Sequence, residues 1–175
     1  MLAKSLVAAL LAASLASASP VTKRDAATVL SDLETILTEV EAVETAFADW
    51  DGDALGALTL LTYYDDLSSD LETAITDTEA TSTLSTSDSS SITSEVETLG
   101  PSILAALAAI VAKESDAAAA GIQSTLLSSL ETLESETNTL GADLEAIATT
   151  TDAETIASVL TEVDAAFSSA IAAYS

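Results

Sequence analysis

The sequence of 175 residues sets 29 acidic side chains against only four basic ones, which gives a formal net charge of −25 at pH 7. It contains no His and no Cys, so imidazole and thiolate catalysis, disulfides and the usual zinc ligands are excluded. The same charge disfavours nucleic acid and anionic bilayers as partners, because each phosphate contact needs a cation.

The first 24 residues have the features of an export leader. Residues 1–18 are typical of a signal peptide, with a basic start, a short apolar stretch and a small-residue cleavage site. Residues 19–24 are predicted to be a short pro-segment ending at the dibasic pair Lys23-Arg24, and the alternative is two charges on a flexible leader. We therefore expect a secreted protein, possessing no integral membrane segment, whose single domain covers 25–175.

The domain itself has the sequence period of helices. Its apolar residues recur at alternating steps of three and four, and no apolar–polar alternation predicts a strand. Such stripes with short connections predict an all-α fold, an elongated antiparallel bundle of four to five amphipathic helices. The first two stripes are Val29, Leu33, Ile36, Val40, Val43, Phe47 and Trp50, followed by Leu58, Leu61, Tyr64, Leu67, Leu71 and Ile75. The later ones are Ile92, Val96, Leu99, Ile103, Leu107 and Ile110, then Ile122, Leu126, Leu130, Leu133, Thr137, Leu140, Leu144 and Ile147, and finally Ile156, Leu160, Val163, Phe167, Ile171 and Tyr174.

Local signals mark where the later helices are interrupted. Residues 81–91 are almost entirely Ser, Thr and Asp, which predicts a loop. Gly100-Pro101 interrupts the third stripe and predicts a kink or a short break between two collinear pieces. Thr151 with Glu154 three residues later matches a capping box, which predicts the start of the last helix.

No catalytic residue, metal ligand or cofactor site is predicted. Among so many carboxylates a close pair has no meaning, so acid–base catalysis cannot be located. Asp49, Asp51 and Asp53 resemble the start of a calcium loop, but the required Gly and Glu positions hold Ala54 and Leu60. We therefore interpret these aspartates as the turn and N-cap between two helices.

Four aromatic residues and one lysine have two interpretations each. Phe47, Trp50, Tyr63 and Tyr64 are expected to form a packed aromatic cluster near the first turn, and the alternative is an apolar contact point for a ligand or a surface. Lys113 is the only basic residue after Arg24, so the domain would carry a charge of −28. It is expected to be an exposed lysine among carboxylates, and the alternative is a partner for an anionic head group.

Several segments together carry a resemblance to a known family. They are Asp25, Val29, Leu33 and Ile36 of the first helix, 117–121 (Ala-Ala-Ala-Ala-Gly), 126–133, and the tail over 163–174. In these residues the chain resembles the fungal hydrophobic-surface-binding protein family, which includes the cell-wall galactomannoprotein domains. The resemblance implies a secreted helical bundle. It also implies that some members adsorb to hydrophobic surfaces and recruit polyester-degrading esterases, whereas cell-wall relatives hold fatty acids inside the bundle.

Two functions remain open from the sequence. We favour binding to hydrophobic surfaces, with a secreted esterase or another lipid-degrading hydrolase as a partner, because no residue marks a head-group site. The alternative is a fatty-acid-binding module of the secretome or the cell wall, with its ligand between the helices. Stripe membership alone gives the candidate apolar-binding residues Leu33, Leu37, Val40, Leu61, Leu71, Ile103, Leu107, Leu126, Leu130, Leu160 and Val163.

Overall fold

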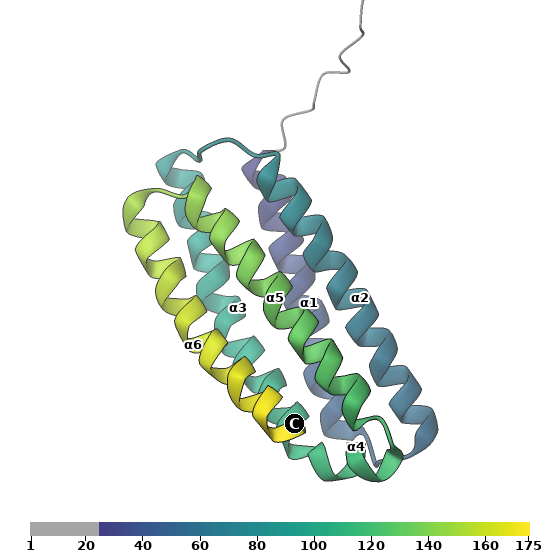
Figure 1. The fold of residues 1–175 in the computed structure, drawn as a ribbon. Coiled ribbons are helices and arrows are strands. Elements are labelled where there is room, and N and C mark those ends of the chain that lie inside the picture. The colour runs from purple at the N-terminus through teal and green to yellow at the C-terminus, as the bar shows by residue number, and fades with distance from the viewer. Residues whose placement is uncertain (1–24) are drawn as a thin grey trace, which may run out of the picture.

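The computed structural model describes residues 25–175, which form helices and no strand (Figure 1). The helices are α1 (Ala26–Asp49), α2 (Ala54–Glu79), α3 (Thr86–Ala112), α4 (Glu114–Ala120), α5 (Gln123–Ile147) and α6 (Thr150–Tyr174). The predicted all-α class is confirmed. The described part of the chain has six helices rather than four to five, because the Ala-rich junction forms the short α4. The predicted signal peptide over 1–18 and the pro-segment over 19–24 lie outside the described residues.

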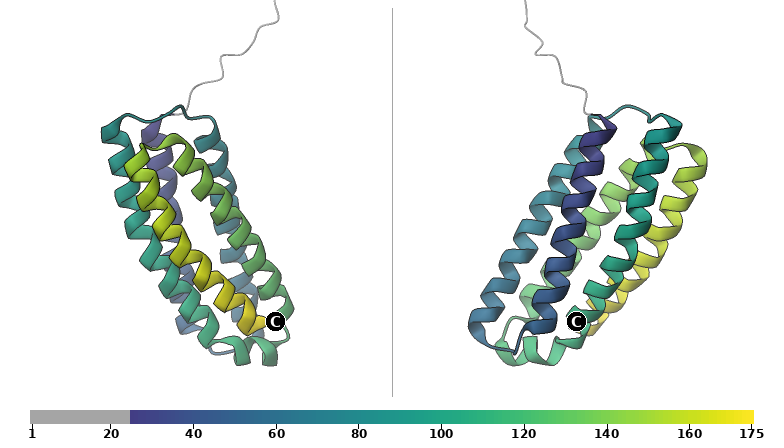
Figure 2. Two further views of the ribbon diagram at one scale, coloured as in Figure 1. Left: turned by 60° about the vertical axis from the view of Figure 1, so that its left-hand side comes forward. Right: turned by 180° about the vertical axis from the view of Figure 1, so that it is seen from behind.

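The five long helices form a ring in the order α1, α2, α5, α6, α3, back to α1 (Figures 1 and 2). Long helices that follow each other in the sequence run in opposite directions, as expected, and the short α4 lies at the end of the bundle between α3 and α5. The connections α2–α3 and α3–α5 cross the ends of the bundle, so that α2 lies parallel to α5, and α3 lies parallel to α1 and α6. With helices about 9 Å apart, the axis of such a ring is roughly 8 Å from each helix axis, against roughly 6 Å for four helices. A five-membered ring therefore leaves more room at its centre.

The buried face of α1 is the predicted one. All six helical members of its stripe are buried, and so is Trp50 just after the helix. The buried face of α2 is rotated from the prediction: its apolar members are Ala57, Leu60, Tyr64, Leu67, Leu71 and Ala74. Leu58 is 64% exposed, so the predicted stripe is wrong at this position, whereas Leu61 and Ile75 are half-buried and pack against the edge of the core. A pattern of large side chains overlooks alanines, which face the core where helices pack closely.

The predicted loop over 81–91 is wrong in its second half, because α3 begins within it. Ser85 is the N-cap of α3, and its hydroxyl accepts a hydrogen bond from the amide of Asp88 at 3.2 Å. Ser89, one turn later, is buried and donates to the carboxylate of Asp152 at the start of α6. A Ser-rich sequence favours a loop locally, but here caps and tertiary hydrogen bonds satisfy the serines within a helix.

The last helix begins earlier than the predicted capping box. Its N-cap is Thr149, whose hydroxyl donates to Asp152 at 2.8 Å. The amide of Thr149 donates to the Ser89 hydroxyl at 2.9 Å, which ties this helix start to α3. The predicted box of Thr151 and Glu154 is therefore wrong, since both residues lie inside the first turns of α6.

Pro101 lies inside α3, which is one continuous helix, so the predicted short break is absent. The neighbouring Gly100 allows α6 to come close, because a Cβ at this glycine would lie 2.6 Å from Cγ1 of Val159. Gly141 on α5 has the same relation to Leu160, with 2.4 Å between the added Cβ and Cδ1. These two glycines allow α6 to pack tightly against both of its neighbours in the ring.

Two of the described helices, α3 and α6, are long and apolar enough to cross a membrane by length and composition. Core helices of soluble bundles satisfy the same criterion. Both helices belong to the ring and contribute their apolar residues to the common core. The finding is therefore weak evidence for a membrane span, and the absence of one stays a prediction.

Candidate functional site

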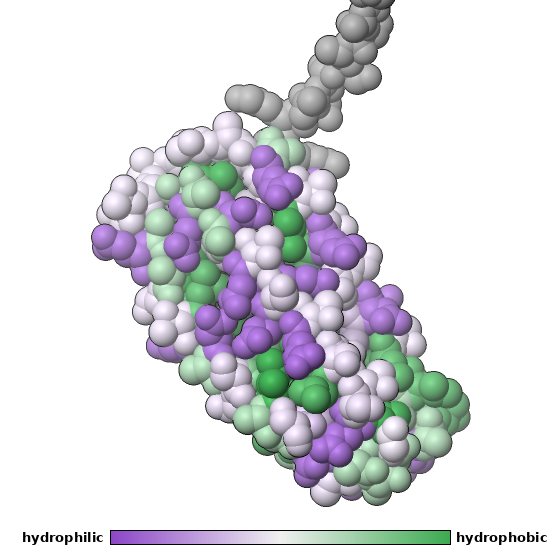
Figure 3. Space-filling model, viewed as in Figure 1, coloured by the Kyte–Doolittle hydropathy of each residue, from purple (hydrophilic) through white to green (hydrophobic). Residues whose placement is uncertain are grey.

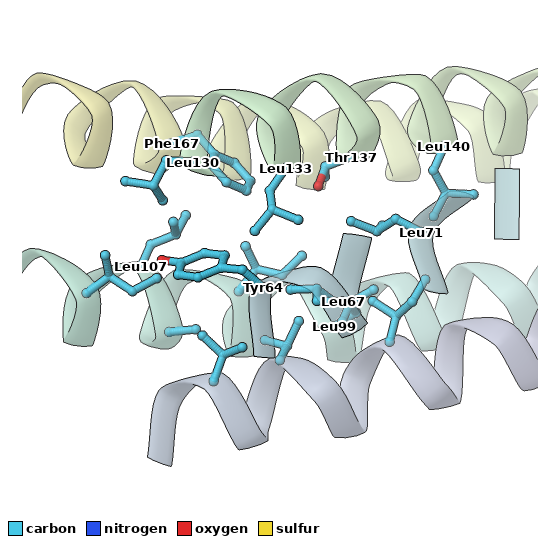
Figure 4. Close-up of a pocket in the computed structure, with 16 residues that line it drawn as sticks. Tyr64, Leu67, Leu71, Leu99, Leu107, Leu130, Leu133, Thr137, Leu140 and Phe167 are labelled. Atoms are coloured by element: carbon cyan, nitrogen blue, oxygen red, sulfur yellow. The ribbon is translucent and has the colours of Figure 1, made fainter. Parts of the chain in front are cut away.

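A cavity lies between the helices of the ring, and all five long helices contribute to its walls (Figure 4). Its volume is about 60 Å³, measured as the space open to the centre of a water molecule. Only Tyr64 and Thr137 bring a side-chain polar atom to the lining. The lining residues are Ile36, Val40, Val43, Tyr64, Leu67, Leu71, Leu99, Ile103, Ala106, Leu107, Ile110, Leu130, Leu133, Thr137, Leu140 and Phe167.

A second apolar cavity, of about 40 Å³ by the same measure, adjoins the first. The two share Leu99, Ile103, Thr137 and Leu140 as walls. The second cavity is otherwise lined by Leu33, Val96, Gly100, Gly141, Leu144, Ile156, Val159, Leu160 and Val163. Along α5 the two linings extend from Leu130 to Leu144, which is about 21 Å of helix at 1.5 Å per residue. Together they form an apolar track along the inside of the ring.

The structure brings eight of the eleven predicted apolar-binding residues to this track. Val40, Leu71, Ile103, Leu107 and Leu130 line the first cavity. Leu33, Leu160 and Val163 line the second, together with Ile103.

The other three predicted residues line neither cavity. Leu126 is fully buried in the core, whereas Leu37 and Leu61 are half-buried. A helix stripe is wider than the part of it that faces the ring axis, so its flanks contact neighbouring helices instead. The candidate list omits Tyr64 and Thr137, although a polar atom in an otherwise aliphatic stripe was a signal for both. For Tyr64 a ligand contact was the alternative interpretation of the aromatic cluster.

The Tyr64 side chain lies across one end of the first cavity, and its hydroxyl points toward Leu107 (Figure 4). Its ring packs edge-on against Phe47 with 5.9 Å between the ring centroids, and Phe47 packs similarly against Trp50. The predicted aromatic cluster is thus confirmed for these three residues. The Tyr64 hydroxyl is buried and has no hydrogen-bond partner. Burial, reinforced by the nearby Tyr174, raises the pKa of Tyr64 well above its usual range, so the phenol stays a neutral donor.

A polar groove between α2 and α5 lies on the other side of the same wall. Tyr64 and Leu133 line both this groove and the first cavity. The groove is otherwise lined by Asp65, Ser68, Thr125, Ser128, Ser129 and Thr132. Ser68 donates a 2.8 Å hydrogen bond across it to Glu136, and burial raises the pKa of that carboxyl despite the hydrogen bond.

The turn between α1 and α2 has the structure expected for capping aspartates. Asp53 is the N-cap of α2 and accepts a hydrogen bond from the amide of Gly56 at 2.7 Å. Asp51 accepts one from the amide of Asp53 at 3.2 Å. Within residues 25–175 no group of three His, Cys, Asp or Glu side chains is placed to hold a metal ion.

Lys113 differs from its prediction as an exposed lysine. It is half-buried at the junction of α3 and α4, and its ammonium group donates to the backbone carbonyl of Trp50. It does not line either cavity. The one basic side chain in the described part of the chain therefore joins two ends of helices and does not face the apolar track.

Comparison with solved structures gives relatives of the same fold. A crystal structure of AfMp4p in complex with palmitic acid is 46% identical, with a TM-score of 0.85 over 86% of this chain and 100% of that chain. Ligand-binding domain 1 of the Penicillium marneffei MP1 protein, complexed with arachidonic acids, is 16% identical with a TM-score of 0.71, over 84% of this chain and 99% of that one. Domain 2 of the same protein, complexed with multiple arachidonic acids, is 18% identical with a TM-score of 0.75, over 88% and 98%. No curated protein sequence matches the chain.

The family comparison agrees with the resemblance seen in the sequence. The family model for hydrophobic surface binding protein A matches residues 26–146, which include α1 to α4 and nearly all of α5. The family is described by the binding of hydrophobic surfaces, and the 46% identical AfMp4p is complexed with palmitic acid, in keeping with the apolar lining of the track. The chain therefore belongs to the hydrophobic surface binding protein A family.

Proposed function

We propose that this protein binds a long-chain fatty acid inside the helix ring, with the acyl chain along the apolar track. The observation that carries the proposal is the pair of adjoining cavities with almost wholly aliphatic walls. The palmitic acid bound by the 46% identical AfMp4p supports the same chemistry. The proposal is one of binding and includes no catalytic step.

The cavities are too small for a fatty acid without some movement of the helices. Even one benzene ring occupies a cavity of about 150 Å³, whereas these measure about 60 and 40 Å³. Burying fifteen methylenes is worth roughly 12 kcal/mol before the costs of ordering the ligand and moving side chains. The sequence contains no Cys, so no disulfide prevents the helices from separating. Burial of the acyl chain therefore offsets part of the cost of expanding the ring.

Native mass spectrometry of the delipidated domain with palmitic acid tests the proposal. We expect a discrete complex with a small whole number of bound acids, because the track has a defined length. A spectrum of protein alone, at palmitic acid concentrations that saturate other fatty-acid-binding proteins, would contradict fatty-acid binding.

A second candidate function is adsorption to hydrophobic surfaces, which the sequence favoured. Leu55 and Leu58 lie three residues apart on one face of α2, and they are 72% and 64% exposed. They form an apolar patch at the end of the bundle where α2 begins (Figure 3). Large exposed leucines in one place are typical of a contact surface.

Replacement of both leucines by serine tests this patch. We expect the double variant Leu55→Ser/Leu58→Ser to bind polystyrene beads at least about tenfold more weakly, because two leucine side chains no longer leave water. The folded core should be unaffected, since neither residue is buried. Depletion from solution by the beads is the measurement, and Val111→Ser at the 38% exposed Val111 is the matched control. Equal depletion of all three proteins would contradict adsorption through this patch.

Recruitment of a secreted esterase to a coated surface belongs to the adsorption proposal and is supported by family membership alone. It is tested by co-sedimentation of a polyester-degrading esterase with beads that carry this protein, against beads that carry albumin. Secretion rests on the leader-like residues 1–18, and association with a cell wall is a further expectation from the family.

A further inference from the structure

We propose that the Tyr64 hydroxyl is the head-group anchor of the cavity and donates a hydrogen bond to an oxygen of an uncharged lipid head group. This inference rests on the proposed binding of fatty acid in the ring and gives the ligand its direction. The head group lies at the end of the first cavity where the hydroxyl points, and the tail passes between Ile103 and Leu140 into the second cavity.

The first step of the argument is the hydroxyl itself. Tyr64 is 2% exposed, and its oxygen has no hydrogen-bond partner, whereas buried polar groups in proteins are normally paired. An unpartnered buried hydroxyl lowers stability, and a ligand oxygen in the cavity would satisfy it. The edge-on contact with Phe47 fixes the ring in this position.

The second step is the direction of the track. The Tyr64 hydroxyl points toward Leu107, away from Leu140, where the second cavity continues (Figure 4). The opposite end, around Leu144 and Ile156, is lined by apolar residues. The two linings extend over about 21 Å, and an extended chain of sixteen carbons is roughly 19 Å long with C–C bonds of about 1.5 Å. An acyl chain anchored at Tyr64 therefore reaches the far end of the track.

The third step is the charge of the head group. Neither cavity is lined by a charged side chain, and Lys113 is held by the carbonyl of Trp50. A carboxylate would be buried here without a cation, which is strongly unfavourable. A neutral phenol suits the oxygen of an uncharged carboxylic acid, an alcohol or an ester. The site thus selects for lipids with a small, uncharged, oxygen-containing head group.

Tyr64→Phe removes only the hydroxyl and tests the anchor. Binding of decanoic acid and decanol is measured by equilibrium dialysis at pH 5, and binding of decane by headspace gas chromatography. We expect Tyr64→Phe to weaken binding of the acid and of the alcohol about two- to tenfold, which is the value of one hydrogen bond. Binding of decane should be unchanged. Tyr63→Phe is the matched control, since the half-buried Tyr63 does not line either cavity. The ligand-free Tyr64→Phe protein should be at least as stable as the wild type, because it loses an unpaired hydroxyl.

The outcomes separate the anchor from the proposed function. Equal binding of decanoic acid by Tyr64→Phe and the wild type, or an equal loss for decane, would overturn the anchor while leaving fatty-acid binding intact. If Thr137→Val weakened binding of decanoic acid and Tyr64→Phe did not, the head group would lie at the junction of the two cavities. That result would also overturn the anchor. Failure of the wild type to bind any of the three compounds would instead overturn the proposed function.

Discussion

Replacement of Ala106 by leucine is expected to weaken palmitic acid binding by at least about tenfold. Ala106 lies on α3, is 5% exposed and lines the first cavity. Three added carbon atoms occupy space that methylenes of the ligand would otherwise fill, at about 0.8 kcal/mol for each methylene excluded. The same atoms fill a cavity of about 60 Å³, so the ligand-free variant should gain about 1 kcal/mol of stability.

Two measurements check this expectation. Titration of delipidated protein with palmitic acid gives the affinity, and urea denaturation gives the free energy of unfolding. Ala108→Leu, on the exposed face of the same helix, is the control and should change neither quantity appreciably. If leucine overpacks the core and lowers stability, the smaller Ala106→Val should retain stability and show part of the same loss of affinity. A folded Ala106→Leu protein with wild-type affinity would contradict binding of the acyl chain in this cavity.

The affinity for decanoic acid is expected to rise about tenfold for each unit by which the pH falls from 7 to 5. A simple carboxyl has a pKa of about 4.3, so the uncharged fraction of the ligand grows tenfold per unit in this range. If only the uncharged acid enters the ring, the affinity follows that fraction and levels off near the pKa of the ligand. Decanol has no charge to lose and serves as the control ligand.

The charged groups of the protein near the track also favour binding of the acid at low pH. Asp65 and Glu136 flank the groove behind Tyr64, and Glu114 and Asp116 lie close enough to Tyr174 to raise its pKa further, after burial. All are acidic, and the raised pKa of Glu136 means that it loses its charge earlier than an ordinary glutamate as the pH falls. Half-buried carboxylates on the other walls include Asp32, Glu95 and Asp143, and no acidic side chain lines either cavity.

Comparison of decanoic acid with decanol decides whether the charge of the ligand causes the dependence on pH. An acid affinity that stays constant from pH 7 to pH 5 would mean that the carboxylate remains charged and in contact with water. An equal rise for decanol would mean that the protein changes with pH, and not the charge of the ligand. Equilibrium dialysis at constant ionic strength measures both, because salt screens the strong negative charge of the domain.

Helix positions and faces were predictable from the sequence to the extent that they depend on local pattern. The stripe from Val29 to Phe47 is buried in full, because long side chains repeat on one face of α1 without exception. The prediction was wrong at Leu58, where the pattern favoured a leucine over the alanine beside it. It was also wrong at Thr151, because Ser89 from a distant helix fixes the start of α6 at Thr149.

The binding track was predictable only as a set of candidate residues. Eight of eleven face it, since a residue on a core stripe has a good chance of facing the axis of a bundle. Leu37, Leu61 and Leu126 belong to the same stripes but lie outside both linings. No local pattern distinguishes a residue that faces the axis from one that faces a neighbouring helix.

By itself the sequence determined the all-helical class, the exclusion of His and Cys chemistry and the acidic charge, because composition and periodicity are local properties of the chain. Only the tertiary structure decided that five helices close into a ring, with α2 beside α5 and α6 tight against Gly100 and Gly141. These contacts join residues far apart in the sequence and set the rotation of each helix about its own axis. That rotation places the Tyr64 hydroxyl in an apolar cavity without a partner.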